Sequence, residues 1–204
     1  HGQCQAAFDV AVDSRGPVIY RQERVGRFGR PFQIVKLRTM YVGAEDDLEG
    51  LVDLDGLQEP VFKLKDDPRV TRVGRFLRRW SIDELPQLIN VLRGEMSLVG
   101  PRPCLFNQEE LIRERDQRGV FSVRPGITGL AQVNGRNLVG WEERFNLDVH
   151  YVDHYDAWMD FKILVLVVLR CLSVGRAYSV SEVEEMLAHP STIPSGGEEM
   201  RAYT

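Results

Sequence analysis

Two arginines and two adjacent carboxylates lie within one short segment of this 204-residue chain. They are Arg78, Arg79, Asp83 and Glu84, and an apolar helical pattern begins directly after them. The free N–H groups at a helix N-terminus, together with arginines, form a site for a phosphate group. A carboxylate held there has its charged form stabilised and can serve as a nucleophile or as a metal ligand. The segment is therefore a candidate for chemistry on a phosphate.

The same carboxylates also fit an ordinary structural role. Residues 81–84, Ser-Ile-Asp-Glu, match the capping-box pattern S-x-x-E, and acidic residues are favourable near the positive end of a helix. Four apolar residues at helical spacing predict one apolar helix face: Leu85, Leu88, Ile89 and Leu92. Gly94 is the expected C-terminal cap. Spacing alone favours capping and leaves the chemical role open.

Composition narrows the class of protein. Hydrophobic residues make up 43% of the chain and charged residues 27%, which is typical of one folded domain. The net charge of −4 argues against nucleic acid as a partner. Three cysteines without a C-x-x-C pair favour a reducing, cytoplasmic setting. The longest apolar run, residues 163–169, is too short to span a bilayer.

The elements around the candidate segment follow from periodicity and turn residues. We expect a hairpin of strands 18–20 and 32–35, further strand-like pieces at 97–99 and 130–133, and helices at 107–118, 141–153 and 160–173. A further helix is expected to start near Gly74 and to bury Phe76 and Leu77. Helix 160–173 has apolar residues nearly all round, so it either packs in the core or lies partly against lipid.

Several other charged residues have two interpretations. The arginines of the hairpin turn, Arg21, Arg24, Arg27 and Arg30, form either a solvated edge or a basic face for lipid headgroups or a nucleotide diphosphate. Arg102, between two prolines, is either part of a chain reversal or an arginine held in place for phosphate. The acidic stretch 43–59 is a solvated helix and loop without metal-ligand spacing. His150 and His154 are helix-face residues without a third zinc ligand in the sequence.

Four blocks of sequence carry a resemblance to a known family. They are residues 16–40 (with Gly-Pro-Val, Gln-Glu-Arg-Val-Gly and Lys-Leu-Arg-Thr-Met), residues 81–103 (with Ser-Ile-Asp-Glu-Leu-Pro-Gln-Leu and Val-Gly-Pro-Arg-Pro), residues 124–136 (with Arg-Pro-Gly-Ile-Thr-Gly and Asn-Gly-Arg), and residues 151–163 (with Tyr-Val and Asp-Phe-Lys-Ile). In this order they resemble the bacterial sugar transferases, the monotopic polyprenyl-phosphate phosphoglycosyl transferases. The resemblance runs from about Gly16 to about Gly175, and four long motifs in order are far more specific than one. Residues 154–156 depart from the family's Asn-Trp-Ser.

The resemblance implies an α/β (α+β-like) fold: a compact, mainly helical catalytic domain with a small β-hairpin and interfacial amphipathic helices. Its implied division is a membrane-proximal segment at 1–15, the catalytic domain at 16–180 and a mostly disordered tail at 181–204. The family carries a hydrophobic re-entrant membrane helix just before the Gly-Pro-Val block. The chain begins with His1 and lacks that helix, so we expect it to be a piece of a longer protein.

The resemblance also implies an activity. A UDP-sugar, expected to carry a hexose, donates its sugar-1-phosphate to membrane polyprenyl (undecaprenyl) phosphate, and the products are polyprenyl-diphosphate-sugar and UMP. The reaction runs through a covalent aspartyl phospho-sugar enzyme with Mg²⁺ or Mn²⁺, at the cytoplasmic face of the bacterial inner membrane. Such a transfer is the first step in the assembly of a polysaccharide or another glycoconjugate. A homo-oligomer is an open alternative to a monomer.

The site residues are carried over position by position. Asp83 is the expected nucleophile and a metal contact, and Glu84 is expected to position the metal or the acceptor phosphate. The expected phosphate contacts are Lys36, Arg78, Arg102 and Arg136, with Arg38 a weaker candidate, and the Gly-rich loop at 124–136 is a candidate nucleotide loop. Two rival functions remain: a metal-dependent UDP-sugar phosphodiesterase, and a non-catalytic scaffold in which the two carboxylates only cap a helix.

Overall fold

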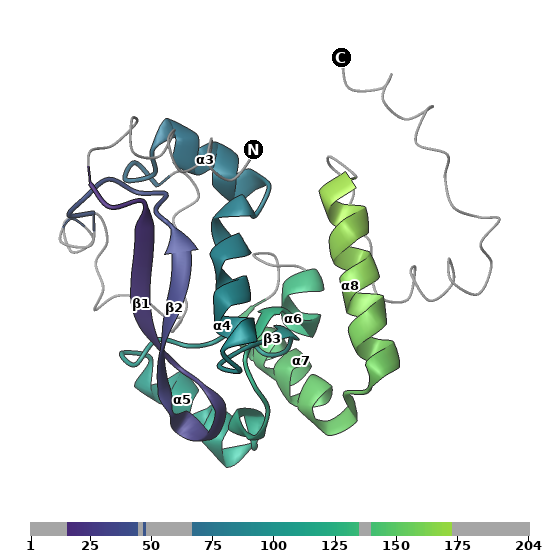
Figure 1. Cartoon of the computed structure of the whole chain (residues 1–204). Coiled ribbons are helices and arrows are strands. Elements are labelled where there is room, and N and C mark those ends of the chain that lie inside the picture. The colour runs from purple at the N-terminus through teal and green to yellow at the C-terminus, as the bar shows by residue number, and fades with distance from the viewer. Residues whose placement is uncertain (1–15, 45–46, 48–66, 135–139, 173–204) are drawn as a thin grey trace.

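The computed structural model describes residues 16–44, 47, 67–134 and 140–172, and it shows a mainly helical α/β fold with two small sheets (Figure 1). The predicted fold class is therefore confirmed. The elements are β1 (Ile19–Val25), η1 (Arg27–Gly29), β2 (Pro31–Leu37), α3 (Arg72–Arg79), η2 (Ile82–Gln87), α4 (Leu88–Leu92), β3 (Ser97–Val99), α5 (Glu109–Gln117), η3 (Val120–Ser122), β4 (Gly126–Thr128), α6 (Leu130–Val133), α7 (Trp141–His154) and α8 (Ala157–Leu172). The η elements are 3₁₀ turns.

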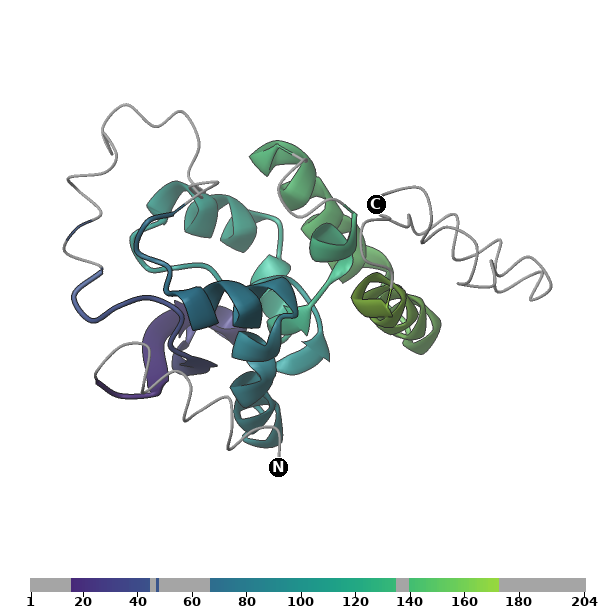
Figure 2. The same cartoon turned by 90° about the horizontal axis from the view of Figure 1, so that it is seen from above.

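The hairpin and the two C-terminal helices lie on opposite sides of the fold. Seen from above, β1 and β2 lie on one side, α7 and α8 lie on the other, and α3 and α4 lie between them (Figure 2). Predictions for residues 1–15, for most of the acidic stretch 43–59 and for the tail 181–204 fall outside the described residues. No helix in the described part of the chain is both long and apolar enough to cross a bilayer.

The predicted hairpin is confirmed and is longer than the sequence indicated. β1 and β2 pair antiparallel from Ile19 opposite Leu37 to Val25 opposite Pro31. Asn90 of α4 satisfies the other edge of β2: its Oδ1 accepts a hydrogen bond from the Val35 N–H at 3.1 Å, and its Nδ2 donates to the Gln33 carbonyl at 2.7 Å. A side chain thus covers backbone groups that a further strand would otherwise pair.

The second sheet joins the chain after α4 to the Gly-rich loop. β3 and β4 pair in parallel, with Ser97 opposite Gly126 and Val99 opposite Thr128. A Cβ on Gly126 would lie 2.2 Å from the Gly100 nitrogen, so only glycine permits this approach of the two backbones. These glycines therefore have a packing role. The strand expected at 130–133 is wrong, because the strand ends at Thr128 and residues 130–133 form α6.

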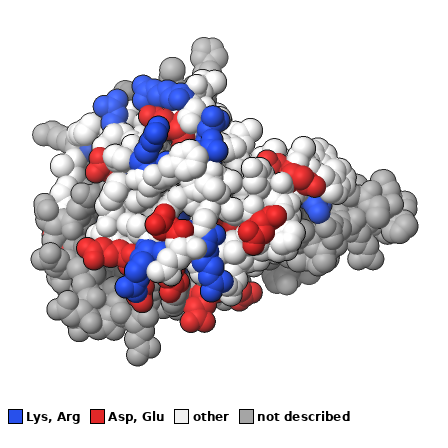
Figure 3. Space-filling model, turned by 90° about the horizontal axis from the view of Figure 1, so that it is seen from below, with Lys and Arg blue, Asp and Glu red and all other residues white. Residues whose placement is uncertain are grey.

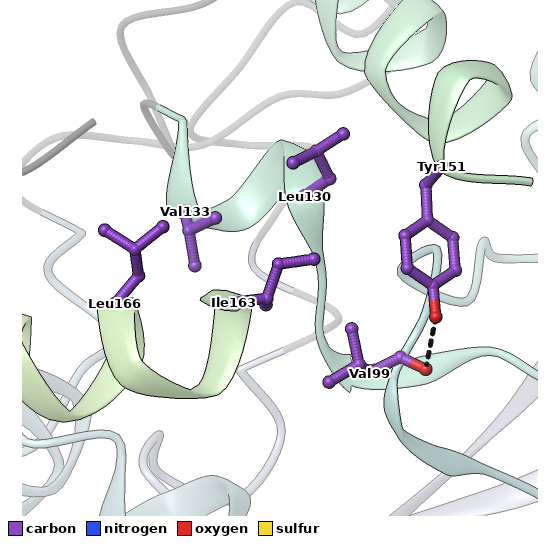
Figure 4. Packing of buried hydrophobic residues seen from close by; sticks show 6 residues of the cluster. All are labelled: Val99, Leu130, Val133, Tyr151, Ile163 and Leu166. Carbon is purple, nitrogen blue, oxygen red and sulfur yellow. Dashed lines mark hydrogen bonds between the residues drawn. The ribbon is translucent and has the colours of Figure 1, made fainter. Parts of the chain in front are cut away.

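The main core lies where α8 meets β3, α6 and α7. Ile163 and Leu166 are fully buried against Val99, Leu130, Val133 and Tyr151 (Figure 4). The Tyr151 hydroxyl donates a hydrogen bond to the Asp160 carboxylate at 2.7 Å, which ties α7 to the start of α8. The helices expected at 141–153 and 160–173 are confirmed, and α8 packs one face while Trp158, Phe161 and Val168 stay exposed.

Helix α3 begins earlier than predicted, and it buries one of the two apolar side chains that were expected to be buried. Thr71 caps it, because the Thr71 hydroxyl accepts a hydrogen bond from the Gly74 N–H at 2.9 Å. A Cβ on Gly74 would lie 2.0 Å from the Thr39 carbonyl oxygen, which fixes the inward face of the helix. Leu77, three residues later, shares this face and is 1% exposed, as predicted. The predicted burial of Phe76 is wrong: it lies off this face and is 57% exposed.

Asn90 should be a major contributor to stability, because it is 0% exposed and its side chain bonds two backbone groups of β2. Replacing it in the variant Asn90→Ala leaves the buried Val35 N–H unpaired, so we expect a loss of about 2–4 kcal/mol in the free energy of unfolding. Urea titration followed by circular dichroism measures this loss. The neighbouring half-exposed Ile89 is the control, and Ile89→Ala should cost about 1 kcal/mol or less. Equal losses in both variants would contradict this role.

Candidate active site

The two candidate carboxylates lie on η2, directly after a sharp turn at Ser81. Ser81 has φ 54° and ψ 24°, the left-handed region, which turns the chain out of α3. A capping serine normally has extended backbone and bonds an N–H two or three residues on, whereas the Ser81 side chain makes no such cap bond. The capping-box interpretation is therefore wrong, and η2 begins without a side-chain cap.

Glu84 instead forms the centre of an ion-pair cluster. Its Oε1 accepts a hydrogen bond from Lys36 Nζ at 3.1 Å and another from Arg102 Nη2 at 3.0 Å. Burial disfavours the charged form of Glu84, but Arg102 and Lys36 outweigh it and lower its pKa to about 2. Glu84 is thus a permanently ionised carboxylate that joins β2, η2 and the loop after β3.

Lys36 and Arg102 differ in their access to solvent. The Lys36 side chain is largely buried, and burial together with the nearby Arg102 charge lowers its pKa to about 8. Arg102 is half-exposed, and both prolines beside it are buried. Its guanidinium therefore reaches from a fixed backbone to Glu84 while keeping a surface for a ligand.

Asp83 lies beside this cluster without a direct partner. Among the described residues, the Asp83 carboxylate makes no ion pair, and the hydrogen bond recorded for it comes from its own backbone N–H. Burial and the adjacent Glu84 charge raise the pKa of Asp83, while Lys36 and Arg78 act against the shift. Arg78 is held in place because its Nε donates a hydrogen bond to the Thr39 hydroxyl at 2.8 Å. Of the two carboxylates, Asp83 is thus the candidate nucleophile, because Glu84 is held by two cations.

Arg24 belongs to the same cluster, although the sequence did not distinguish it from the other arginines of the hairpin turn. Its Nη2 donates to Gln22 Oε1 at 2.6 Å, and its Nε is buried without a partner among the described residues. Burial and the nearby Arg102 charge lower its pKa to about 10, and Glu84 acts against this shift. The strand register contained the signal. Arg24 alternates with Gln22 and Tyr20, and Tyr20 lies opposite Lys36, so Arg24 and Lys36 share one face of the hairpin.

The cluster carries more positive than negative charge. Four cations, Arg24, Lys36, Arg78 and Arg102, surround two carboxylates, Asp83 and Glu84. The excess of two positive charges in a partly buried place matches an anionic ligand such as a diphosphate. Five of the predicted site residues therefore come together. Arg136 lies outside the described residues, and Arg38 is buried and donates a hydrogen bond to the Gly16 carbonyl, so it serves the fold.

The donor atoms of the site fit a magnesium ion that arrives with its substrate. Within the described residues, no three His, Cys, Asp or Glu side chains gather to make a complete protein cage. Mg²⁺ commonly binds through one or two carboxylates, several waters and substrate phosphates. Asp83 and the second oxygen of Glu84 supply that kind of incomplete ligand set.

The apolar face predicted on this segment exists but is not buried. Leu85, Leu88 and Ile89 are about half-exposed, and Leu92 is 88% exposed. The buried residues of the segment are polar: Gln87 and Asn90. Asn90 on the inward face bonds backbone groups of β2, and the apolar residues are left on the outside. Such a contiguous exposed apolar face is typical of a contact with a membrane or a partner.

Comparison with known proteins supports the family suggested by the motifs. A family model described as "Bacterial sugar transferase" matches residues 4–173. The chain is 46% identical over 152 residues to the galactosyl transferase CpsE of Streptococcus agalactiae serotype III (strain NEM316), covering 74% of this chain and 34% of that protein. It is 47% identical over 163 residues to the uncharacterized sugar transferase EpsL of Bacillus subtilis (strain 168), covering 80% and 74%.

A third relative has a name that states a reaction. The chain is 41% identical over 180 residues to the UDP-glucose:undecaprenyl-phosphate glucose-1-phosphate transferase of Caulobacter vibrioides (strain ATCC 19089 / CIP 103742 / CB 15), covering 85% of this chain and 63% of that protein. The chain thus spans about a third of the Streptococcus relative and larger shares of the other two. The family match extends over most of the chain and includes every described residue of the charged cluster. The chain belongs to the bacterial sugar transferase family.

Proposed function

We propose that this domain transfers a hexose-1-phosphate from a UDP-sugar to polyprenyl phosphate, giving polyprenyl-diphosphate-sugar and UMP. The observation that carries the proposal is that two neighbouring carboxylates differ in their ion pairs. Glu84 is ion-paired with Lys36 and Arg102, while Asp83 makes no ion pair with another described residue inside a cluster of excess positive charge. The names of the relatives include both glucose and galactose transfer, so the proposal extends to hexoses as a class.

In the first step, an oxygen of Asp83 attacks the β-phosphorus of the UDP-sugar. The bond between that phosphorus and the bridging oxygen breaks, and UMP leaves with the bridging oxygen. The phospho-sugar stays on Asp83 as an acyl phosphate, so one difficult transfer is divided into two. The raised pKa of Asp83 makes its ionised form a stronger nucleophile, and Arg78 and Lys36, whose charges act on Asp83, would hold the phosphate oxygens.

In the second step, an oxygen of polyprenyl phosphate attacks the same phosphorus. The Asp83–phosphorus bond breaks, the Asp83 carboxylate is regenerated, and the sugar leaves on a new diphosphate. Arg102, which pairs with Glu84, and Arg24, whose charge acts on the same cluster, would neutralise the acceptor phosphate. Mg²⁺ or Mn²⁺, held by Asp83 and Glu84, would neutralise charge on the diphosphate and on departing UMP.

The lipid acceptor requires the site to work at a membrane surface. The exposed apolar face of Leu85, Leu88, Ile89 and Leu92 begins at the residue after Glu84, which supports this placement. Seen from below, the surface of the molecule shows basic and acidic side chains interspersed (Figure 3). We therefore propose that the apolar face of η2 and α4 rests on the cytoplasmic surface of the inner membrane, with the charged cluster at the level of the headgroups.

A panel of UDP-sugars with and without undecaprenyl phosphate, in the presence of Mg²⁺, tests the activity. Sustained UMP release that requires the lipid, from a UDP-hexose, is the expected result. Sustained release without lipid would instead identify a phosphodiesterase. If the folded protein in membranes releases no UMP from any donor, the result would favour the function of a non-catalytic scaffold.

The variant Asp83→Asn should abolish turnover, by more than about 10³-fold, because an amide oxygen is a far weaker nucleophile than a carboxylate. Intact-mass measurement of the wild-type protein after incubation with UDP-hexose and Mg²⁺ should show an added hexose-phosphate. The variant should show none. The matched control is Asp116→Asn on α5, an exposed aspartate outside the cluster, which should keep both adduct and turnover. Near-normal turnover in Asp83→Asn would rule out the covalent step.

Replacing two apolar residues of α4 in the variant Ile89→Glu/Leu92→Glu should weaken membrane binding. Each exposed apolar side chain that enters the interface contributes about 1.5–3 kcal/mol, so we expect at least a tenfold loss in partitioning. Co-sedimentation with phosphatidylglycerol-containing vesicles measures it. The matched control is Phe28→Glu/Phe106→Glu, which changes two exposed aromatic residues on η1 and ahead of α5. Unchanged partitioning in the α4 variant, or an equal loss in the control, would contradict this placement.

A further inference from the structure

The backbone of the loop that carries Arg102 is held by hydrogen bonds at four consecutive residues. Three elements donate hydrogen bonds to four consecutive carbonyl groups. The donors and acceptors are Gly126 N–H to Pro101 O at 2.9 Å, Arg115 Nη1 to Arg102 O at 2.6 Å, Arg24 Nη1 to Pro103 O at 3.4 Å, and Val25 N–H to Cys104 O at 3.1 Å. Two of these donors are backbone groups, and the bond to the Arg102 carbonyl is the shortest of the four.

The donor to Arg102 is itself anchored by a buried acid. Arg115 of α5 is 7% exposed and Asp148 of α7 is 2% exposed. Arg115 Nη2 forms an ion pair with the Asp148 carboxylate, while Arg115 Nη1 reaches the Arg102 carbonyl. One guanidinium therefore links α7, α5 and the backbone of a residue whose side chain binds Glu84. Neither Arg115 nor Asp148 was singled out by its sequence pattern.

Stability is a poor explanation for this pair. Removing two charges from water costs several kcal/mol per ion, and a well-packed apolar pair of similar volume is often as stable or more so. Burial raises the pKa of Asp148, and Arg115 acts against the shift, as expected for a carboxylate kept ionised at a cost. A buried ionic pair of this kind is better explained by the geometry that it enforces.

We propose that the Arg115–Asp148 pair positions Arg102, so that the Arg102 guanidinium meets both Glu84 and the substrate phosphate. Arg115 and Asp148 are positioning residues, since neither side chain contacts Asp83 or Glu84 in the described structure. The bond to the Arg102 carbonyl fixes where the Arg102 side chain starts, and the flanking prolines restrict the backbone on both sides. The catalytic consequence of this inference rests on the proposed function, whereas its structural consequence does not.

The test replaces the pair with apolar residues in the variant Arg115→Met/Asp148→Leu. This change removes both buried charges together, so the protein should fold with a midpoint of unfolding close to that of the wild type. The bond to the Arg102 carbonyl is lost. We expect kcat/KM for the UDP-hexose to fall about tenfold or more. A second variant, Arg115→Lys, keeps the charge beside Asp148 but offers one ammonium in place of the two-pronged guanidinium, so it should show a similar fall.

A double-mutant cycle separates positioning from a general loss of activity. The variant Arg102→Ala should lower kcat/KM strongly in the wild-type background but by less than about threefold in the Arg115→Met/Asp148→Leu background, because Arg102 is already misplaced there. If Arg102→Ala lowered kcat/KM by the same factor in both backgrounds, the proposal would be overturned. The control is Arg118→Met, which removes a cation that also links the end of α5 to α7, over the Phe145 ring at 5.4 Å, without touching the loop. It should keep wild-type kinetics.

A crystal structure of the Arg115→Met/Asp148→Leu variant gives a result independent of activity. The Arg102–Glu84 ion pair, 3.0 Å in the wild type, should be broken or lengthened beyond the roughly 4 Å limit of an ion pair. An intact pair in the folded variant would overturn the positioning role. If the wild-type protein released no UMP with any donor, the proposed function would fail, and this structure would still decide whether the buried pair positions Arg102.

Discussion

The ion pairs of Glu84 are the constraint on which the rest of the site depends. One carboxylate oxygen accepts hydrogen bonds from Lys36 on β2 and from Arg102 on the proline-flanked loop. Because these groups come from distant parts of the chain, the hairpin, η2 and the loop must all hold their places for the cluster to form. The excess positive charge would be unfavourable without an anion, which makes the site receptive to a diphosphate before any substrate arrives.

The division between the two carboxylates explains how adjacent residues take different roles. Glu84 has its charge stabilised by two direct partners, whereas burial and the Glu84 charge itself make ionised Asp83 less stable and raise its pKa. The turn at Ser81 leads into η2 without a side-chain cap, and Glu84 bonds Lys36 of the hairpin instead of capping a helix. Local backbone geometry therefore turns a common capping pattern into a candidate reactive centre.

Local patterns predicted the hairpin, the buried Leu77 and the two C-terminal helices, because alternation and helical periodicity report which face is apolar. They failed where contacts between distant parts of the chain determine which residues are buried or where an element ends. The apolar face of α4 was visible in the sequence, but nothing local shows that Asn90 on the opposite face is needed to satisfy β2. Likewise, the pattern 130–133 reads as strand, although the Gly126 contact with Gly100 places the strand earlier.

The site was predictable in its parts and not in its assembly. Motif resemblance pointed to Lys36 and Arg102, whose meeting at Glu84 the structure shows. Arg24 was hidden among similar arginines, and only the register of β1 against β2 distinguishes it. The Arg115–Asp148 pair has no sequence signal, because its two members are 33 residues apart on separate helices and meet only through tertiary packing.

The central claim is that Asp83 reacts covalently while Glu84 stays bound to its cations. Isotope exchange tests it most directly. Labelled UMP is incubated with the protein, Mg²⁺ and an unlabelled UDP-hexose, without any polyprenyl phosphate, and label in the UDP-hexose is measured over time. A covalent phospho-sugar on Asp83 predicts steady exchange, since the first step runs in both directions without an acceptor. No exchange from a protein that turns over normally with lipid would contradict the account and indicate direct transfer.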